Sequence, residues 1–162
     1  MKTVLQDFQC YTGGLINVIE GGKPKKMPQP RLAVLENLSL SYLHEPTKIV
    51  QVRALLDTGN DITMVRRERI WDLERILNLK IYERRQFSYY SDVNKRESFQ
   101  PAFPLALSLT PSDRYSSKYG FISPSVYSFN FDSFDVWIGR DILNQLICTF
   151  NGVDGTLTII QP

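Results

Sequence analysis

Apolar and polar residues alternate along two neighbouring stretches in the first half of the chain. Residues 32–42 and 48–56 both place apolar side chains at about every second position, and a short polar turn separates them. A period of two is typical of a β-strand with one buried face. The second stretch ends on Leu55 and Leu56, apolar on both faces, as in a strand that enters a core. The pattern therefore predicts a β-hairpin.

Two later segments have other periods. In residues 66–79, apolar residues recur at steps of three and four from Ile70 to Leu77, with charged side chains between them. This predicts an amphipathic helix with a solvated charged face. A second, short helix is predicted near residues 140–146. Further strands are expected at residues 103–109, 119–122, 126–131, 147–150 and 156–160. The chain is thus predicted to be mostly β with two helices.

The first 30 residues differ from the rest. Residues 3–11 and 15–20 flank a Thr-Gly-Gly turn and predict a hairpin. Residues 21–30 (GGKPKKMPQP) are rich in glycine, proline and lysine, which predicts an exposed linker. We therefore divide the chain into an N-terminal hairpin and linker, residues 1–30, and a folded domain, residues 31–162.

Composition narrows the function classes. The 162 residues, 43% of them hydrophobic, are enough for one domain. The net charge of +2 is not the footprint of a nucleic-acid-binding protein. No run of 18 apolar residues and no apolar N-terminal leader is present, so no membrane partner is expected. Two distant cysteines and a single histidine, His44, match neither a disulfide framework nor a metal site. These features favour a cytoplasmic protein.

The tripeptide Asp57-Thr58-Gly59 is the strongest candidate for chemistry. An apolar strand runs directly into an acid, and a carboxylate at a buried strand end is costly unless it is needed there. The Thr58 hydroxyl can donate and accept, and Gly59 lets the backbone approach closely. By itself the tripeptide is weak evidence, because Asp and Gly also favour an ordinary turn.

Two segments together resemble the retropepsin family of aspartic proteases. Residues 53–65 (RALLDTGNDITMV) are similar to the active-site hairpin of that family, and residues 136–151 (VWIGRDILNQLICTFN) are similar to its hydrophobic-hydrophobic-Gly segment and following helix. The resemblance covers about residues 32–160. It implies a mostly β, retropepsin-like closed barrel that acts as a homodimer without a metal or organic cofactor. The terminal strands, above all residues 156–160, are expected to form the dimer contact. Residues 1–30 lie outside the resemblance and are interpreted as a propeptide, removed by autocleavage near residues 20–31, or as an accessory to the dimer.

The resemblance also implies roles for individual residues. Asp57 corresponds to the catalytic aspartate. Thr58 corresponds to the hydroxyl of a network that crosses between subunits, and Gly59 to a contact with the substrate backbone. Asp61 corresponds to a position that binds the substrate main chain and pairs with the arginine matched by Arg140. We interpret Asp61 and Arg140 as a mainly structural ion pair, because a partly buried charge needs a partner.

Two features depart from the family pattern. Asn60 replaces the usual alanine or serine, which affects how substrate fits at this position. The flap, a hairpin that closes over substrate, is expected between Phe87 and Pro101, yet the segment lacks a glycine-rich tip. The candidate contacts near the tip of this flap are Tyr89, Tyr90 and Ser91.

The sequence leaves two main hypotheses of different classes. The first is an aspartic endopeptidase that cleaves a peptide or protein substrate with Asp57 of each of two copies. The second is a catalytically idle domain of the same fold, a dimerising peptide-binding or regulatory module. The intact Asp57-Thr58-Gly59 favours the enzyme. A third hypothesis, an unrelated β-rich interaction domain, requires both motif matches to be accidental.

Overall fold

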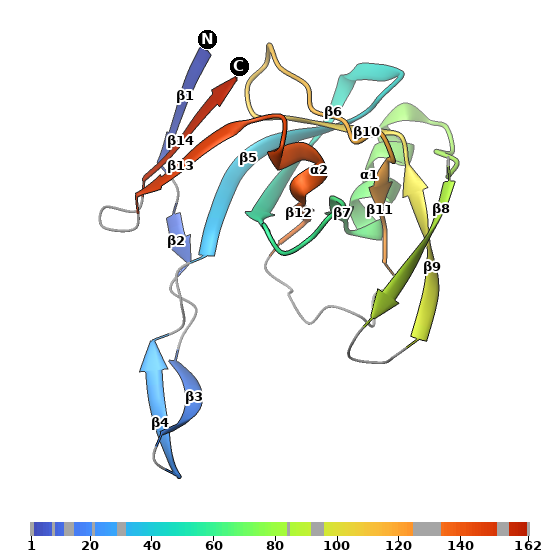
Figure 1. The fold of residues 1–162 in the computed structure, drawn as a ribbon. Coiled ribbons are helices and arrows are strands. Elements are labelled where there is room, and N and C mark those ends of the chain that lie inside the picture. Colours follow the sequence, from blue (N-terminus) through green and yellow to red (C-terminus); the bar gives the residue numbers. More distant parts are fainter. Residues whose placement is uncertain are drawn as a thin grey trace.

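The computed structural model describes residues 2–7, 9–11, 15–20, 22–28, 32–83, 85–91, 96–124, 134–151 and 156–161. In these ranges the protein is mostly β, with a curled main sheet and few helices (Figure 1). The main sheet has the strand order β10-β5-β6-β12-β7-β11-β9-β8, with β2 paired to β5. Its strands are β2 (Gln9–Tyr11), β5 (Leu32–Tyr42), β6 (Glu45–Leu56), β7 (Met64–Val65), β8 (Arg85–Ser91), β9 (Arg96–Phe103), β10 (Leu105–Ser108), β11 (Phe121–Ile122) and β12 (Val136–Ile138).

The described residues also form two smaller sheets. The terminal sheet has the order β1-β14-β13 and consists of β1 (Lys2–Asp7), β13 (Ile147–Asn151) and β14 (Thr156–Gln161). The other is a two-stranded hairpin of β3 (Leu15–Glu20) and β4 (Lys23–Pro28), which projects away from the rest of the molecule in Figure 1. Both chain ends lie at the terminal sheet.

The strand predictions hold in most of the chain. β5 spans residues 32–42 as expected, and β6 begins three residues earlier than expected, at Glu45. The expected strand 103–109 is interrupted at Pro104, between β9 and β10, because proline has no N–H to donate to a ladder. β11 is shorter than the expected strand 119–122. The expected strand 126–131 lies outside the described residues.

Both predicted helices are present, with different ends. α1 (Arg67–Leu77) buries Ile70 and Leu73, and Asn78 ends it in the left-handed conformation at φ 52°. Asparagine tolerates that conformation better than most residues. α2 (Arg140–Leu143) is shorter than the expected 140–146. Its last turn tightens into bonds that span three residues, and β13 then begins.

The N-terminal hairpin prediction is wrong in its pairing. β1 pairs with β14 at the other end of the chain, and β2 pairs with β5. The expected linker 21–30 contains β4, which pairs with β3. Alternation in a short strand predicts the strand but not its partner. Here both strands pair with strands that are distant in sequence. Two strands from residues 1–30 are therefore paired with strands of residues 31–162.

β14, the strand expected to contact a second copy, is the central strand of the terminal sheet. Thr158 of β14 lies opposite Leu5 of β1 on one side and opposite Thr149 of β13 on the other. Both edges of β14 are therefore occupied within the chain. A strand from a second copy can pair with this sheet only at the outer edges of β1 and β13, unless one of them is displaced.

Side chains of β6 and β12 alternate between two hydrophobic clusters. Ala54 and Leu56 of β6 belong to the larger cluster with Ile138 of β12, whereas Leu55 and Trp137 belong to the smaller one. Because successive side chains of a strand point to opposite faces, the sheet is covered on both faces here. This confirms the prediction that the end of the second strand is apolar on both sides.

β12 lies between the two strands that flank the candidate tripeptide. It runs parallel to β6, with Trp137 opposite Leu55, and antiparallel to β7, with Trp137 opposite Met64. The chain that joins β6 to β7, residues 57–63, therefore passes over the C-terminal end of β12. This insertion brings the two motifs of the sequence together.

Candidate active site

The candidate site is built on the loop of residues 57–63 and the start of α2. The backbone N–H of Asp57 donates to the carbonyl of Ile138 at 3.0 Å, which continues the β6–β12 pairing into the loop. From the other side, the N–H groups of Arg140 and Asp141 donate to the carbonyls of Asn60 and Asp61 at 2.8 and 3.1 Å. Three backbone bonds thus fix the loop against the second motif.

Both oxygens of the Asp57 carboxylate accept hydrogen bonds from its own loop. The N–H of Gly59 donates to Oδ1 at 3.0 Å, and the side-chain amide of Asn60 donates to Oδ2 at 2.6 Å. The N–H of Asn60 also donates to the carbonyl of Asp57 at 3.2 Å. Asp57 is half-buried. The loop therefore presents an acid of defined orientation at the end of a buried strand.

Gly139 allows the loop to cross so close to β12. A Cβ at this position would lie 2.6 Å from the carbonyl carbon of Ile62 and 2.9 Å from the N of Thr63. Backbone atoms that close cannot be accommodated by a side-chain movement. The glycine of the second motif is therefore required by the approach of the first motif, a reason that sequence alone did not give.

Thr63 and Asp141 connect the two motifs through side chains. Thr63 is fully buried, and both its N–H and its hydroxyl donate to Asp141 Oδ1, at 2.9 and 2.7 Å. The same hydroxyl oxygen accepts from the N–H of Gly139 at 3.1 Å. Neither side chain was among the site residues predicted from the sequence. The only sequence signal was that both lie within the matched segments.

Asp61 and Arg140 form the predicted ion pair. Its setting differs from the expectation, because the side chains are 78% and 53% exposed rather than partly buried. Exposed ion pairs contribute little to stability, about 0–1 kcal/mol. The expectation that these charges are partly buried is therefore wrong, and the pair contributes little to stability.

Thr58 lies in the loop, and the candidate flap is a separate hairpin. Thr58 is exposed, which leaves its side chain accessible to another molecule. β8 and β9 form an antiparallel hairpin, with Tyr89 opposite Ser98, in the region expected for the flap. The side chains of Tyr89, Tyr90 and Ser91 and the turn 92–95 lie outside the described part of the structure.

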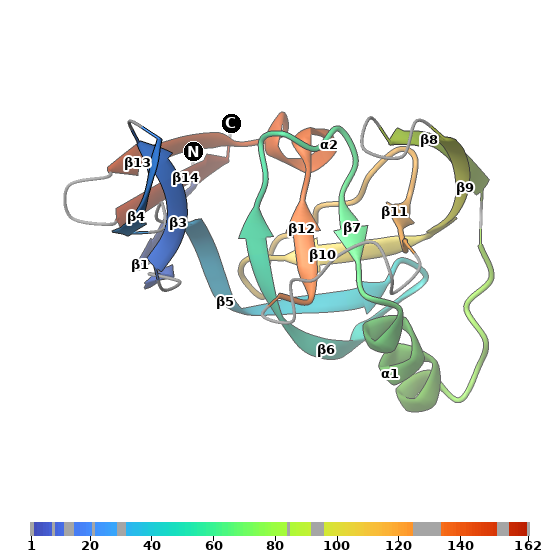
Figure 2. The ribbon, with the colours of Figure 1, turned by 90° about the horizontal axis from the view of Figure 1, so that it is seen from below.

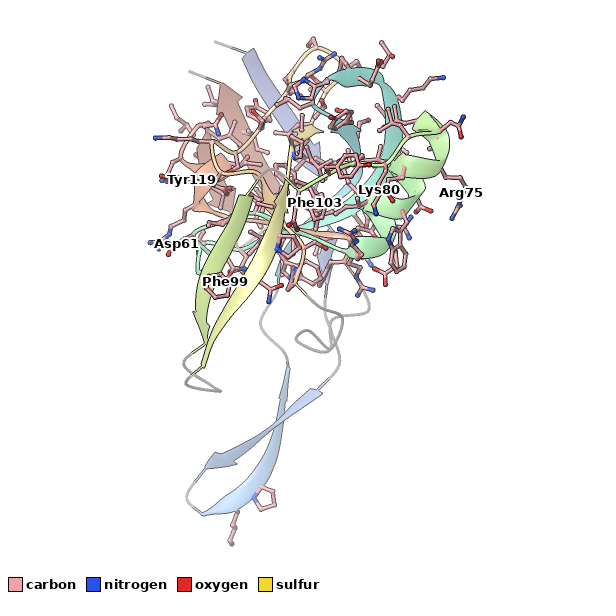
Figure 3. All side chains as sticks on the ribbon, turned by 90° about the vertical axis from the view of Figure 1, so that its right-hand side faces the viewer. Asp61, Arg75, Lys80, Phe99, Phe103 and Tyr119 are labelled. Atoms are coloured by element: carbon pink, nitrogen blue, oxygen red, sulfur yellow. The ribbon has the colours of Figure 1, made fainter. Side chains whose placement is uncertain are left out.

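β9 carries an exposed aromatic residue, Phe99, on the same side of the molecule as the candidate site. Phe99 is 67% exposed, and Figure 3 shows it on the same side of the molecule as Asp61, with Arg75 and Lys80 on the opposite side. In Figure 2 the loop between β6 and β7, α2, β13 and the ends of β8 and β9 all lie along the upper side of the view. These elements therefore lie on one side of the molecule.

The described ranges hold no group of three His, Cys, Asp or Glu side chains placed to bind a metal ion. Among the helices described, none is long and apolar enough to span a membrane. Comparisons of the chain with protein-family models, curated proteins and solved structures find no significant match. The geometry of the 57–63 loop and the residues that build it are therefore the basis for assigning a function.

Proposed function

We propose that this protein is an aspartic endopeptidase of the retropepsin type, whose active site forms between two copies of the chain. The observation that carries the proposal is the meeting of the two motifs around Asp57. The 57–63 loop crosses the end of β12, and its acid is oriented by two donors from the same loop. A strand-ending turn with no function has no need for this second motif beneath it.

The chemistry follows from one carboxyl group per chain. Two carboxyl groups held within about 3 Å cannot both ionise easily, so the pair shares one proton. The ionised Asp57 accepts a proton from a water molecule between the two. The protonated Asp57 of the second copy donates to the oxygen of the scissile carbonyl as the water attacks its carbon. The peptide bond breaks when the first Asp57 passes the proton it took from water to the nitrogen, which leaves as the amine. A hydroxyl group of the tetrahedral intermediate returns its proton to the Asp57 of the second copy as the carboxylic acid product forms.

Other residues of the loop support this assignment. Thr58 is exposed in the single chain, as expected of a residue that contacts a second copy. The exposed Asp61 can accept a hydrogen bond from the main chain of a peptide while it remains paired with Arg140. The β8–β9 hairpin on the same side supplies a candidate cover that excludes water from the reaction.

The test is a peptide-library cleavage assay that compares the wild type with Asp57→Asn from acidic to neutral pH. We expect cleavage by the wild type only, with activity that falls on dilution as the dimer dissociates. Cleavage that survives the substitution contradicts the mechanism. If neither protein cleaves any peptide while both remain folded and dimeric, the idle binding module replaces the enzyme as the function.

A further inference from the structure

Asn60 contacts Asp57 more closely than any other described side chain does. Its amide nitrogen lies 2.6 Å from Asp57 Oδ2, while among the described residues the other carboxylate oxygen accepts only from a backbone N–H, that of Gly59. Asn60 is half-buried, whereas its neighbours Gly59 and Asp61 are exposed. Its side chain is thus turned toward the acid of its own chain.

The chemistry of an amide suits this position. An ionised carboxylate only accepts hydrogen bonds, so the amide must present its NH₂ group and not its oxygen. The NH₂ group cannot lose its proton, and a hydrogen bond to a charged acceptor is roughly twice as strong as one between neutral groups. With a donor on each oxygen, rotation of the carboxylate about its Cβ–Cγ bond costs at least one of these bonds.

We propose that Asn60 is a positioning residue that fixes the orientation of the Asp57 carboxylate for peptide hydrolysis. The inference rests on the proposed endopeptidase function and assigns Asn60 a role other than shaping the fit of substrate. The hydrogen bond from Asn60 to Oδ2 fixes the plane of the Asp57 carboxylate. The carboxylate then keeps one orientation relative to the shared proton and the attacking water. The effect of Asn60 is therefore on the rate of the chemical step and not on the affinity for substrate.

The kinetic test compares Asn60→Ala with Asn60→Ser on one peptide substrate. We expect Asn60→Ala to lower kcat roughly 10- to 100-fold, the loss of one charge-assisted hydrogen bond, with KM changed less than about threefold. Asn60→Ser is nearly the same size as the alanine variant but retains a donor, so it should recover part of kcat. The matched control is Asn144→Ala, an exposed asparagine at the end of α2, which should behave as the wild type.

Two kinetic outcomes overturn the proposal. A higher KM with unchanged kcat in Asn60→Ala means that Asn60 lines the substrate site instead. Equal kcat values for the alanine and serine variants mean that the hydrogen bond to Asp57 has no part in the reaction.

A second measurement needs no activity and separates the failure of this inference from the failure of the proposed function. In ¹⁵N NMR spectra, the side-chain NH₂ signals of Asn60 should differ between the wild type and Asp57→Ala, because the carboxylate acceptor is lost. Unchanged Asn60 signals overturn the positioning contact even if the wild type cleaves peptides. Shifted signals in a wild type that cleaves nothing support the contact and reject the endopeptidase.

Discussion

Asp141 accepts two hydrogen bonds from Thr63, one from the backbone N–H at 2.9 Å and one from the hydroxyl at 2.7 Å. Through the same hydroxyl, Thr63 accepts from the N–H of Gly139. The pair joins the end of the Asp57 loop to the first turn of α2. The Asp57 loop is therefore held by a partly buried polar contact between two residues 78 positions apart.

Replacing the hydroxyl of Thr63 tests how much this contact contributes. Thr63→Val keeps the shape of the side chain but leaves the Gly139 N–H without an acceptor and removes one donor from Asp141. We expect the free energy of unfolding to fall by about 1–3 kcal/mol, the cost of a buried unsatisfied group. Urea unfolding measures the change. Thr63→Ser keeps the hydroxyl and should lose only about 1 kcal/mol, so equal losses contradict the role of the hydrogen bonds.

The two glycines of the site should respond differently to alanine. In Gly139→Ala the new Cβ meets the backbone of Ile62 at 2.6 Å, so the loop must move and we expect a loss of stability of roughly 1–3 kcal/mol or more.

In Gly59→Ala the new Cβ meets only the Asp57 carboxylate, at 3.2 Å. This variant should unfold within about 0.5 kcal/mol of the wild type, as exposed substitutions usually do, yet cleave peptides more slowly because Asp57 is displaced. Thermal unfolding and peptide cleavage, measured on both variants, check the contrast. If the two variants lose similar amounts of stability, the backbone contact of the new Cβ at residue 139 is not the cause of the loss.

The local elements of the fold could be predicted from the period of the sequence. Residues 32–42 alternate and form β5, and the helical steps from Ile70 to Leu77 form α1. Each pattern arises because one face of the element packs against the core, so the order of apolar residues within that segment is enough to predict it. The pairing of β1 with β14 could not be predicted, because a short alternating strand fits several partners equally well.

The candidate site, too, could be predicted only in part. Asp57 and Arg140 could be identified because each lies in a distinctive run of residues. The bond from Asn60 to Asp57 could not, because it depends on the conformation of the loop. The contact between Thr63 and Asp141 could not, because it joins segments that meet only in the assembled sheet. Exposure is also set by the assembled fold, and the ion pair of Asp61 is more exposed than its sequence implied.

Cys148 gives a prediction for alkaline pH. Burial raises the pKa of its thiol, since the side chain packs against the larger hydrophobic cluster. A raised pKa means that the folded state favours the neutral thiol. This stabilisation is complete below the pKa of the unfolded thiol, near 8.5, and is lost as the pH rises through the folded value.

In a Cys10→Ser background, the stability of the parent relative to its Cys148→Ala variant should therefore decrease as the pH rises above about 8.5. Paired urea unfolding curves at several pH values measure the difference, and the subtraction removes the titration of tyrosine and lysine. A difference that does not change with pH means that the thiol titrates alike in the folded and unfolded states.

Deleting β1 tests whether the N-terminal segment belongs to the fold. Removing residues 1–7 uncovers the edge of β14, whose other edge is paired with β13. We expect a lower urea midpoint and more self-association, because an uncovered edge strand can pair with another chain. Unfolding curves and size-exclusion chromatography with light scattering measure the two effects.

The β3–β4 hairpin offers the matched control, because its two strands pair with each other and form their own sheet. Tyr11 and Leu32, the residues on either side of it, lie opposite each other in the β2–β5 pair, so a short Gly-rich turn can replace residues 12–31. This variant should keep the midpoint and the oligomeric state of the parent. If it loses as much stability as the β1 deletion, the effect of β1 is not due to the edge of β14. If neither deletion changes the midpoint, residues 1–30 are an appendage, as expected of a propeptide.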